Sequence, residues 1–209
     1  MPRSASAAAV LVLACVAATV TAGAQTRSQA RFGVGLGATA PRGNYHADSN
    51  GEGFNTGWQG LAFLEFRAPR RPLGLRVEVM FGENPGNDVL IADGTSFFGQ
   101  PVDVKMRMVG ANVDLTYNLR RSSRGGGAYL LGGIGSERVT FATKVGTVSV
   151  DSSETKFAWS VGGGLTFPIG GAAMFVELRY VDVATAFSVG KLPFVALTAG
   201  FRLGRRQGA

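Results

Sequence analysis

The chain has 209 residues, of which 45% are hydrophobic and 31 are glycine, and its formal net charge is +7 at pH 7. A basic chain can bind nucleic acid, but the Lys and Arg residues here are dispersed over predicted turns and strand faces and form no stripe, so we expect no nucleic-acid partner. The frequent glycines interrupt every helical pattern, which favours strands. The one cysteine, Cys15, leaves no partner for an intrachain disulfide.

The N-terminus predicts export. Arg3 is the only charged residue before Arg27, and residues 5–22 are small and apolar. Ala22-Gly23-Ala24 then matches the small-x-small pattern that a signal peptidase cleaves. We therefore expect residues 1–24 to be a signal peptide that is removed on export.

Two other interpretations of the N-terminus stay open. The Ala-rich run could anchor the chain in a membrane, although it is marginal for spanning about 30 Å of hydrocarbon. Cys15 could mark a lipoprotein cleavage site, but the residues after it stay apolar, whereas a lipoprotein usually turns polar there. Beyond the signal no stretch approaches about 18 consecutive apolar residues, so no membrane-spanning helix is expected. Residues 25–209 show no boundary or linker and predict one domain.

Eight segments of this domain alternate between apolar and polar or small residues, which predicts eight β-strands. In chain order they are residues 31–39, 57–67, 73–81, 109–119, 128–135, 157–167, 174–180 and 195–203. Residues 102–108 precede the fourth segment and alternate in the opposite phase. That change of phase predicts either a bulge or a strand that projects beyond the main body of the sheet.

The connections between these segments alternate in length. Short links follow the second, fourth and sixth segments, at residues 68–72, 121–127 and 168–172. Long polar links follow the first, third, fifth and seventh segments, at residues 41–56, 82–101, 136–156 and 182–191. An antiparallel up-and-down order of strands therefore places tight turns at one end of the sheet and long loops at the other.

The composition of the two faces indicates which solvent each one meets. The polar faces are rich in Gly, Ala, Ser and Thr, which suit a narrow lumen, and most strands have about 9–11 residues, enough to cross a bilayer at a tilt. Aromatic residues gather near strand ends, as the interfacial girdles of membrane barrels require. The predicted girdle residues are Trp58, Phe66, Phe81, Tyr117, Tyr129, Trp159, Phe167, Tyr180 and Phe201. We expect an all-β fold, an eight-stranded antiparallel up-and-down transmembrane barrel. The alternative is a soluble lipocalin-like binding barrel with its apolar face inward.

Opposite charges recur on the polar faces. Because an unpaired buried charge is unfavourable and a barrel of eight strands is just wide enough for side chains to fill, we predict a luminal charge network that plugs the barrel. Its members are Glu65, Arg67, Arg76, Glu78, Asp114, Glu177, Arg179 and Arg202. Two alternatives stay open: pairs that lie at the wet rims, and a narrow pore for small solutes.

Three stretches carry a family resemblance: GVGLGAT (residues 33–39), GGGLTFPIGGAAMFVELRY (162–180) and FVALTAGFRLG (194–204). With the rhythm of loops and turns, they resemble the small eight-stranded outer-membrane barrels of the OmpA-transmembrane-domain and OmpX type. The resemblance implies a Gram-negative-type outer membrane, long loops outside, turns in the periplasm, and outer-membrane lipids and the barrel insertion machinery as partners. Such barrels often end on an aromatic residue, whereas residues 205–209 follow the last strand here, so Phe201 or Leu203 would have to serve internally.

We expect no enzyme, metal or cofactor. The only histidine, His46, lies in a predicted loop with Asp48 and Ser49, and a loop tip does not hold a catalytic triad. His46 with Asp48 and Glu52 is also a poor ligand set for a metal ion. The expected role is structural or adhesin-like, with long loops that could contact an unknown extracellular ligand.

Overall fold

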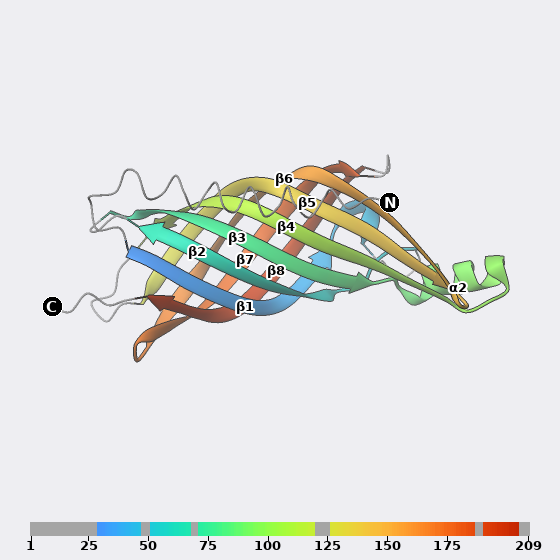
Figure 1. The fold of residues 1–209 in the computed structure, drawn as a ribbon, viewed down its shortest axis with the longest axis horizontal. Helices are drawn as coiled ribbons and strands as arrows, with labels where there is room; N and C mark the ends of the chain where they lie inside the picture. Colours follow the sequence, from blue (N-terminus) through green and yellow to red (C-terminus); the bar gives the residue numbers. More distant parts are fainter. Residues whose placement is uncertain (1–28, 47–50, 68–70, 120–125, 187–189, 205–209) are drawn as a thin grey trace, which may run out of the picture.

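The computed structural model describes residues 29–46, 51–67, 71–119, 126–186 and 190–204. Eight antiparallel strands form a closed up-and-down barrel in which each strand pairs with the next and β8 returns to β1 (Figure 1). The predicted fold class is thereby confirmed. The strands are β1 (Gln29–Pro41), β2 (Gly57–Arg67), β3 (Leu73–Pro85), β4 (Val102–Asn118), β5 (Gly127–Val145), β6 (Val148–Ile169), β7 (Ala172–Ala186) and β8 (Gly190–Gly204). The predicted signal peptide lies outside the described residues, and the domain boundary at residue 25 stays a prediction.

Two short helices lie between strands at the outer end of the barrel. The 3-10 helix η1 (Gly43–Tyr45) follows β1, and the α-helix α2 (Asp88–Phe98) lies between β3 and β4. The Asn87 side chain caps α2 by accepting a hydrogen bond from Leu90 N at 2.9 Å, and Gly99 ends it in the left-handed conformation at φ 64°. No helix in the described part of the chain has the length and apolar character that a membrane crossing requires.

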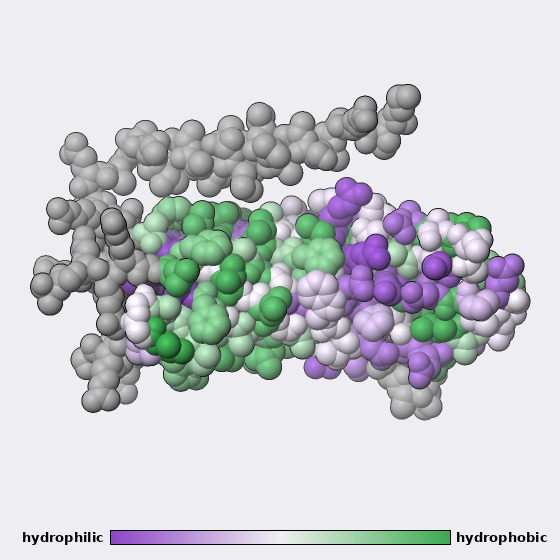
Figure 2. Space-filling view, turned by 60° about the horizontal axis from the view of Figure 1, so that its bottom comes forward, coloured by the Kyte–Doolittle hydropathy of each residue, from purple (hydrophilic) through white to green (hydrophobic). Residues whose placement is uncertain are grey.

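The outward side chains form an apolar belt around the barrel. Leu36 is 69% exposed and Leu115 is 61% exposed, and their outward neighbours on every strand are also apolar. Figure 2 shows this belt as a broad hydrophobic surface that gives way to a hydrophilic surface toward the outer end. An exposed apolar surface of this extent indicates contact with a membrane. The soluble alternative was therefore wrong, because it requires the apolar faces to point inward.

Outward aromatic residues lie at both borders of the belt. Eight of the nine predicted girdle residues point outward and form one row toward each end of the barrel. The outer row is Trp58, Phe81, Trp159 and Tyr180, and the row near the tight turns is Phe66, Tyr117, Phe167 and Phe201. Trp58 contacts Phe81 with ring centroids 5.3 Å apart, and Trp159 contacts Tyr180 at 5.6 Å.

The prediction for Tyr129 was wrong. This side chain is only 2% exposed and faces the lumen, while its neighbour Leu130 takes the lipid-facing place. Apolar residues occupy both parities of Ala128-Tyr129-Leu130-Leu131, so alternation alone does not determine which residues point inward. The register decides: Tyr129 lies opposite Gly164, whose missing side chain leaves room for the ring.

The change of phase before the fourth predicted strand reflects a change of solvent. Strand β4 pairs with β3 and β5 without a register shift, so there is no bulge and the predicted projecting strand is confirmed. Met106 and Met108 point inward on the same face as Asp114. Beyond the belt the outside is water, so polar residues such as Lys105 point outward and apolar residues fill the interior. The hydropathy pattern therefore inverts although the backbone alternation continues.

The predicted long loop at residues 136–156 is instead a projecting hairpin. Strands β5 and β6 stay paired to Val145 and Val148, and a two-residue turn with Gly146 at φ 57° joins them. The loop at 182–191 is likewise mostly strand. Sequence patterning missed these extensions because outside the membrane neither face of a projecting strand must be continuously apolar. As Figure 1 shows, β4, β5 and β6 extend well past the rest of the barrel, with α2 at their tip.

Spin labels test the orientation of the belt. Nitroxides at Val77, Val113, Val161 and Leu197 should be accessible to oxygen and shielded from a water-soluble nickel complex, because these positions face hydrocarbon. A label at Thr140, which lies opposite the outward Arg107 beyond the belt, should show the reverse. Power-saturation electron paramagnetic resonance in lipid vesicles measures both. Water accessibility at the four belt positions would contradict the orientation.

Candidate functional site

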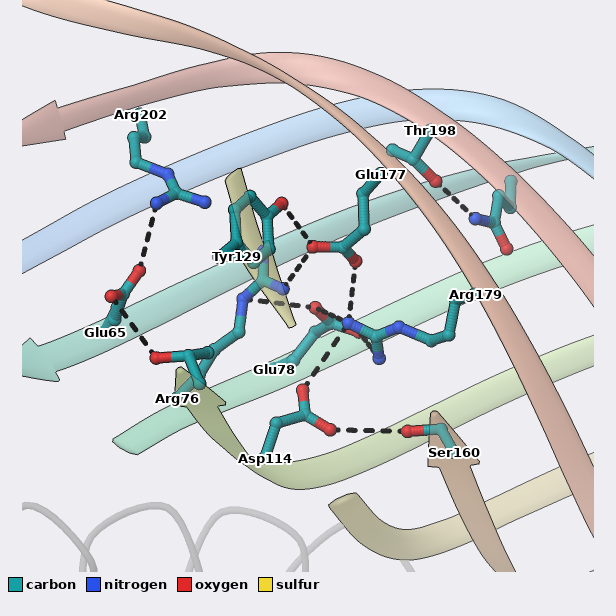
Figure 3. Close-up of polar contacts among 12 residues, drawn as sticks. Glu65, Arg76, Glu78, Asp114, Tyr129, Ser160, Glu177, Arg179, Thr198 and Arg202 are labelled. Atoms are coloured by element: carbon teal, nitrogen blue, oxygen red, sulfur yellow. Dashed lines mark hydrogen bonds and ion pairs between the residues drawn. The ribbon is translucent and has the colours of Figure 1, made fainter. Parts of the chain in front are cut away.

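All eight residues of the predicted charge network point into the lumen, and none is more than 5% exposed. They come from β2, β3, β4, β7 and β8, and Figure 3 shows most of them converging on the barrel axis. Strands β3 and β7 are four places apart in a ring of eight, so they form opposite walls. Ion pairs between these two strands therefore cross the full width of the lumen.

Arg179 is the centre of the network. Its guanidinium donates from Nη1 to Glu78 Oε1 at 2.7 Å and from Nη2 to Glu78 Oε2 at 3.0 Å, a bidentate pair across the lumen. Nη2 also donates to Glu177 Oε1 at 2.8 Å and lies 3.5 Å from Asp114 Oδ2. One cation thus holds three carboxylates from three strands.

Arg76 makes the complementary crossing. Its Nη1 donates to Glu177 Oε2 at 2.7 Å, and its Nε lies 3.5 Å from Glu78 Oε2. The guanidinium also stacks 3.6 Å from the centroid of the Phe63 ring. Taken in the order Arg76, Glu78, Arg179 and Glu177, the four residues therefore alternate in sign around a closed ring, and each charge faces two opposite charges.

A second cluster lies nearer the tight turns. Glu65 pairs with Arg67 of the same strand and with Arg202 Nη1 at 3.3 Å. The Arg202 guanidinium lies 4.9 Å from the centroid of the Tyr129 ring and 5.5 Å from that of Phe175, so aromatic faces surround it. The Tyr129 hydroxyl donates to Glu177 Oε2 at 2.7 Å and links this cluster to the central ring.

Sequence reasoning missed several members of the network. Glu137 is fully buried and accepts a hydrogen bond from Asn112 Nδ2 at 3.2 Å, but it lay in a segment predicted to be a loop. Tyr129 was assigned to the lipid surface, and Gln59, whose Nε2 donates to Thr198 Oγ1 at 2.6 Å, carries no charge to draw attention. For Glu137 a signal was available in the sequence, because Glu137 and Val139 are two positions apart and would share one face of a strand.

Above the charges, toward the outer end, the lumen is apolar. Met80, Met106, Met108, Val139 and Phe194 are buried there in one cluster. Phe141 stacks on Phe54 with centroids 5.5 Å apart and on Tyr45 at 6.0 Å, which extends the cluster to the outer rim. A cavity of about 10 Å³ lies between the two layers and is lined by Gln59, Glu78 and Phe194 among others. That volume is about the minimum for one water molecule.

The loop residues considered for chemistry are not assembled into a site. His46 is exposed, and its backbone forms an isolated β-bridge with Phe54 and donates to Gly43 O at 3.1 Å, while Asp48 and Ser49 lie outside the described residues. Within the described part of the chain, no three His, Cys, Asp or Glu side chains come together in a way that could hold a metal ion.

Arg179→Met tests the energetics of the network. The substitution leaves Glu78, Glu177 and Asp114 short of a cation, and we expect it to lower the free energy of unfolding by about 3–5 kcal/mol. Adding Glu78→Gln should recover part of that loss because it removes one of the orphaned charges. The matched control is Arg107→Gln, which breaks the exposed Arg107–Glu83 pair (2.9 Å) and should change stability by about 0–1 kcal/mol. Urea unfolding in lipid vesicles measures the free energy of unfolding of all three variants. Equal losses of stability in Arg179→Met and Arg107→Gln would contradict a buried network.

Comparison with known proteins agrees with the geometry. The profile of the outer membrane protein beta-barrel domain matches residues 7–201. A major outer membrane protein of Thermus thermophilus has a similar structure, with 14% identity, a TM-score of 0.57, and coverage of 84% of this chain and 99% of that one. Ail, the attachment invasion locus protein of Yersinia pestis, solved in complex with the heparin analogue sucrose octasulfate, gives 13% identity, a TM-score of 0.53, and coverage of 84% and 97%. At these identities the structures show the fold alone, and no curated protein matches the sequence. The family match spans most of the chain, and the chain therefore belongs to the outer membrane protein β-barrel domain family, whose place is the outer membrane.

Proposed function

We propose that this protein is a closed outer-membrane barrel that anchors and presents its projecting extracellular strands, in a structural or adhesin-like role. The closed barrel is supported by two ion pairs that cross the lumen, Arg179 with Glu78 and Arg76 with Glu177. These four side chains lie on the barrel axis and pair with one another, so their charges are not left free to attract a passing ion. The apolar cluster above them supports closure, because an ion would have to leave water to pass it.

The projecting part supports an interactive role. Strands that only anchor a barrel need to cross the bilayer, yet β5 has 19 residues and β6 has 22, roughly twice the length that a tilted strand requires. The extra length, with α2, builds a platform outside the membrane. This role requires neither a cofactor nor a catalytic residue.

The remaining proposed partners follow from the surface. Outer-membrane lipids would contact the apolar belt and the two aromatic rows. The barrel insertion machinery would read β8 through Phe201 or Leu203, which point outward with 53% and 56% exposure.

Conductance separates a closed barrel from a narrow pore. In planar bilayers the purified protein should give no stable current steps, because paired charges and apolar side chains fill the axis. Folding of the same sample is checked by its shift in electrophoretic mobility on boiling in SDS. Discrete ohmic steps from the folded protein would support the pore instead.

The surface role is tested by shortening the platform. Val139 and Glu154 lie opposite each other, so replacing residues 140–153 with Asn-Gly should close the hairpin near the barrel with a two-residue turn. Cells that display the full chain should adhere to plastic coated with serum proteins, and cells with the shortened hairpin should lose most of that adhesion. The control is equal surface display of both forms. Equal adhesion would contradict a role for the platform and leave the closed barrel standing.

A further inference from the structure

The outer end of the molecule carries exposed apolar side chains. Phe97 and Phe98 are described in α2 near its C-terminal end, and they are 83% and 52% exposed. Their rings contact each other edge to face, with centroids 4.9 Å apart. Val148 and Val150, at the start of β6, are 62% and 63% exposed. We call these four side chains the apolar tip. Large apolar side chains that gather on an exposed surface indicate contact with a partner.

Hydrogen bonds join α2 to the β5–β6 hairpin at this end. Gly146 N in the hairpin turn donates to Pro101 O at 3.0 Å, and Val102 N donates to Thr95 Oγ1 at 3.3 Å. Gly99 N donates back to Thr95 O at 2.9 Å and ends the helix. Figure 1 shows α2 beside the end of the hairpin, at the extreme of the molecule. These bonds satisfy backbone groups that would be unfavourable to transfer unpaired into a nonpolar medium.

The apolar tip lies too far out to reach the bilayer that surrounds the belt. On β6, Val148 is 11 residues beyond Trp159, a member of the outer aromatic row. At about 3.3 Å per residue this distance is about 36 Å along the strand, or about 25 Å above the row at a tilt of about 45°. Figure 2 shows hydrophilic surface between the belt and the hydrophobic groups near the outer end. The apolar tip is therefore separate from the belt.

The charges around the apolar tip disfavour an anionic partner. Residues 94–102 and 143–150 contain one charged side chain, Lys144. Asp93, Asp103 and Asp151 adjoin the ends of these segments. One Lys against three Asp gives a net charge of −2 for residues 93–103 and 143–151. Anionic lipid surfaces attract basic segments, so this end of the molecule fits a neutral surface better.

We propose that the apolar tip inserts into the interface of a second, zwitterionic lipid bilayer that faces the cell surface. Exposed Phe side chains of peripheral segments enter about 5–10 Å into the boundary between headgroups and acyl chains. The exposed neighbours Ser96, Gln100 and Thr147 are polar and uncharged, which suits the level of the headgroups. The tip is a projection, and a fluid bilayer accommodates a projection without a preformed groove. The inference rests on the proposed function in that the tip must lie outside the cell.

A second copy of this chain is the competing occupant. Two tips that met end to end would bury Phe97 and Phe98 of each copy against the other. They would also bring together two segments that each carry a net charge of −2, which repel each other. A neutral bilayer buries the same apolar side chains without this repulsion.

The test uses the full chain in lipid nanodiscs that hold one copy each. The discs are mixed with sucrose-loaded phosphatidylcholine vesicles, and sedimentation measures the fraction of discs bound. We expect saturable binding that persists at high salt, while discs without protein stay in the supernatant. Vesicles enriched in phosphatidylserine should bind no better, because the residues around the tip carry net negative charge.

The matched variants replace both phenylalanines. Phe97→Ser with Phe98→Ser should weaken vesicle binding about tenfold or more, because a factor of ten corresponds to less than the burial of one whole phenyl side chain. Phe97→Leu with Phe98→Leu keeps most of the apolar area and should bind within about threefold of the wild type. The mobility shift on boiling in SDS verifies that both variants fold.

A fluorescent label reports insertion directly. Nitrobenzoxadiazole is attached at Thr147→Cys, with Cys15→Ser so that the chain has one thiol. Spin-labelled phosphatidylcholine that is present only in the vesicles should quench this label. The same label at Thr140→Cys lies closer to the barrel on β5 and should not be quenched.

Four outcomes would overturn the inference: no vesicle binding by the wild type, equal binding by the serine variant, loss of binding in the leucine variant, or binding that requires anionic lipid. Discs that associate through the tip without vesicles would assign it to a second copy and would also overturn it. Adhesion to serum proteins and conductance test the proposed function separately. A chain that adheres to coated plastic but ignores vesicles would refute the inference and leave the proposed function standing.

Discussion

A strand in hydrocarbon has no water to bond to, so every backbone N–H and C=O must find a partner in the protein. For a sheet the only complete solution is closure, and the pairing of β8 with β1 provides it. The other features follow from this closure. A ring of eight strands leaves a lumen so narrow that side chains fill it. Side chains outside the ring must be apolar, and polar ones inside it must satisfy one another.

The lumen shows how charged side chains are accommodated under that constraint. Each carboxylate of the central ring meets one guanidinium from its own strand and one from the opposite strand, so its desolvation is offset by two partners. Because Arg76 and Arg179 reach partners on the opposite wall, the network also fixes the position of β3 relative to β7, which share no backbone bonds. The apolar layer above the charges excludes water from them and strengthens their attraction. Closure of the sheet and filling of the lumen by side chains are thus two consequences of one geometry.

Outside the membrane the constraint on the backbone is lifted, since water can satisfy an open edge. The projecting strands use this freedom: β5 and β6 stay paired out to Val145 and Val148, whereas among the described residues the pairing of β6 with β7 begins only at Ala158.

Much of this architecture can be predicted from the alternation of apolar and polar residues. The period of two predicts the eight strands, small polar faces and flanking aromatics predict the membrane, and recurring Arg and Glu on the inward faces predict the luminal charges. These features are local, because which face a side chain takes follows from its neighbours two positions away. Three other features depend on which residues the strands bring opposite one another, and only the tertiary structure decided them. Arg179 meets Glu78 across 101 positions, and no local pattern encodes that pairing. Tyr129 faces inward because Gly164 lies opposite it, and residues 136–156 form a hairpin because β5 and β6 stay in register beyond the belt. Where water replaces lipid outside the barrel, the outward face of a strand no longer has to be apolar, so the sequence pattern that identifies a strand is lost. There only the pairing with a neighbouring strand shows that the segment is a strand.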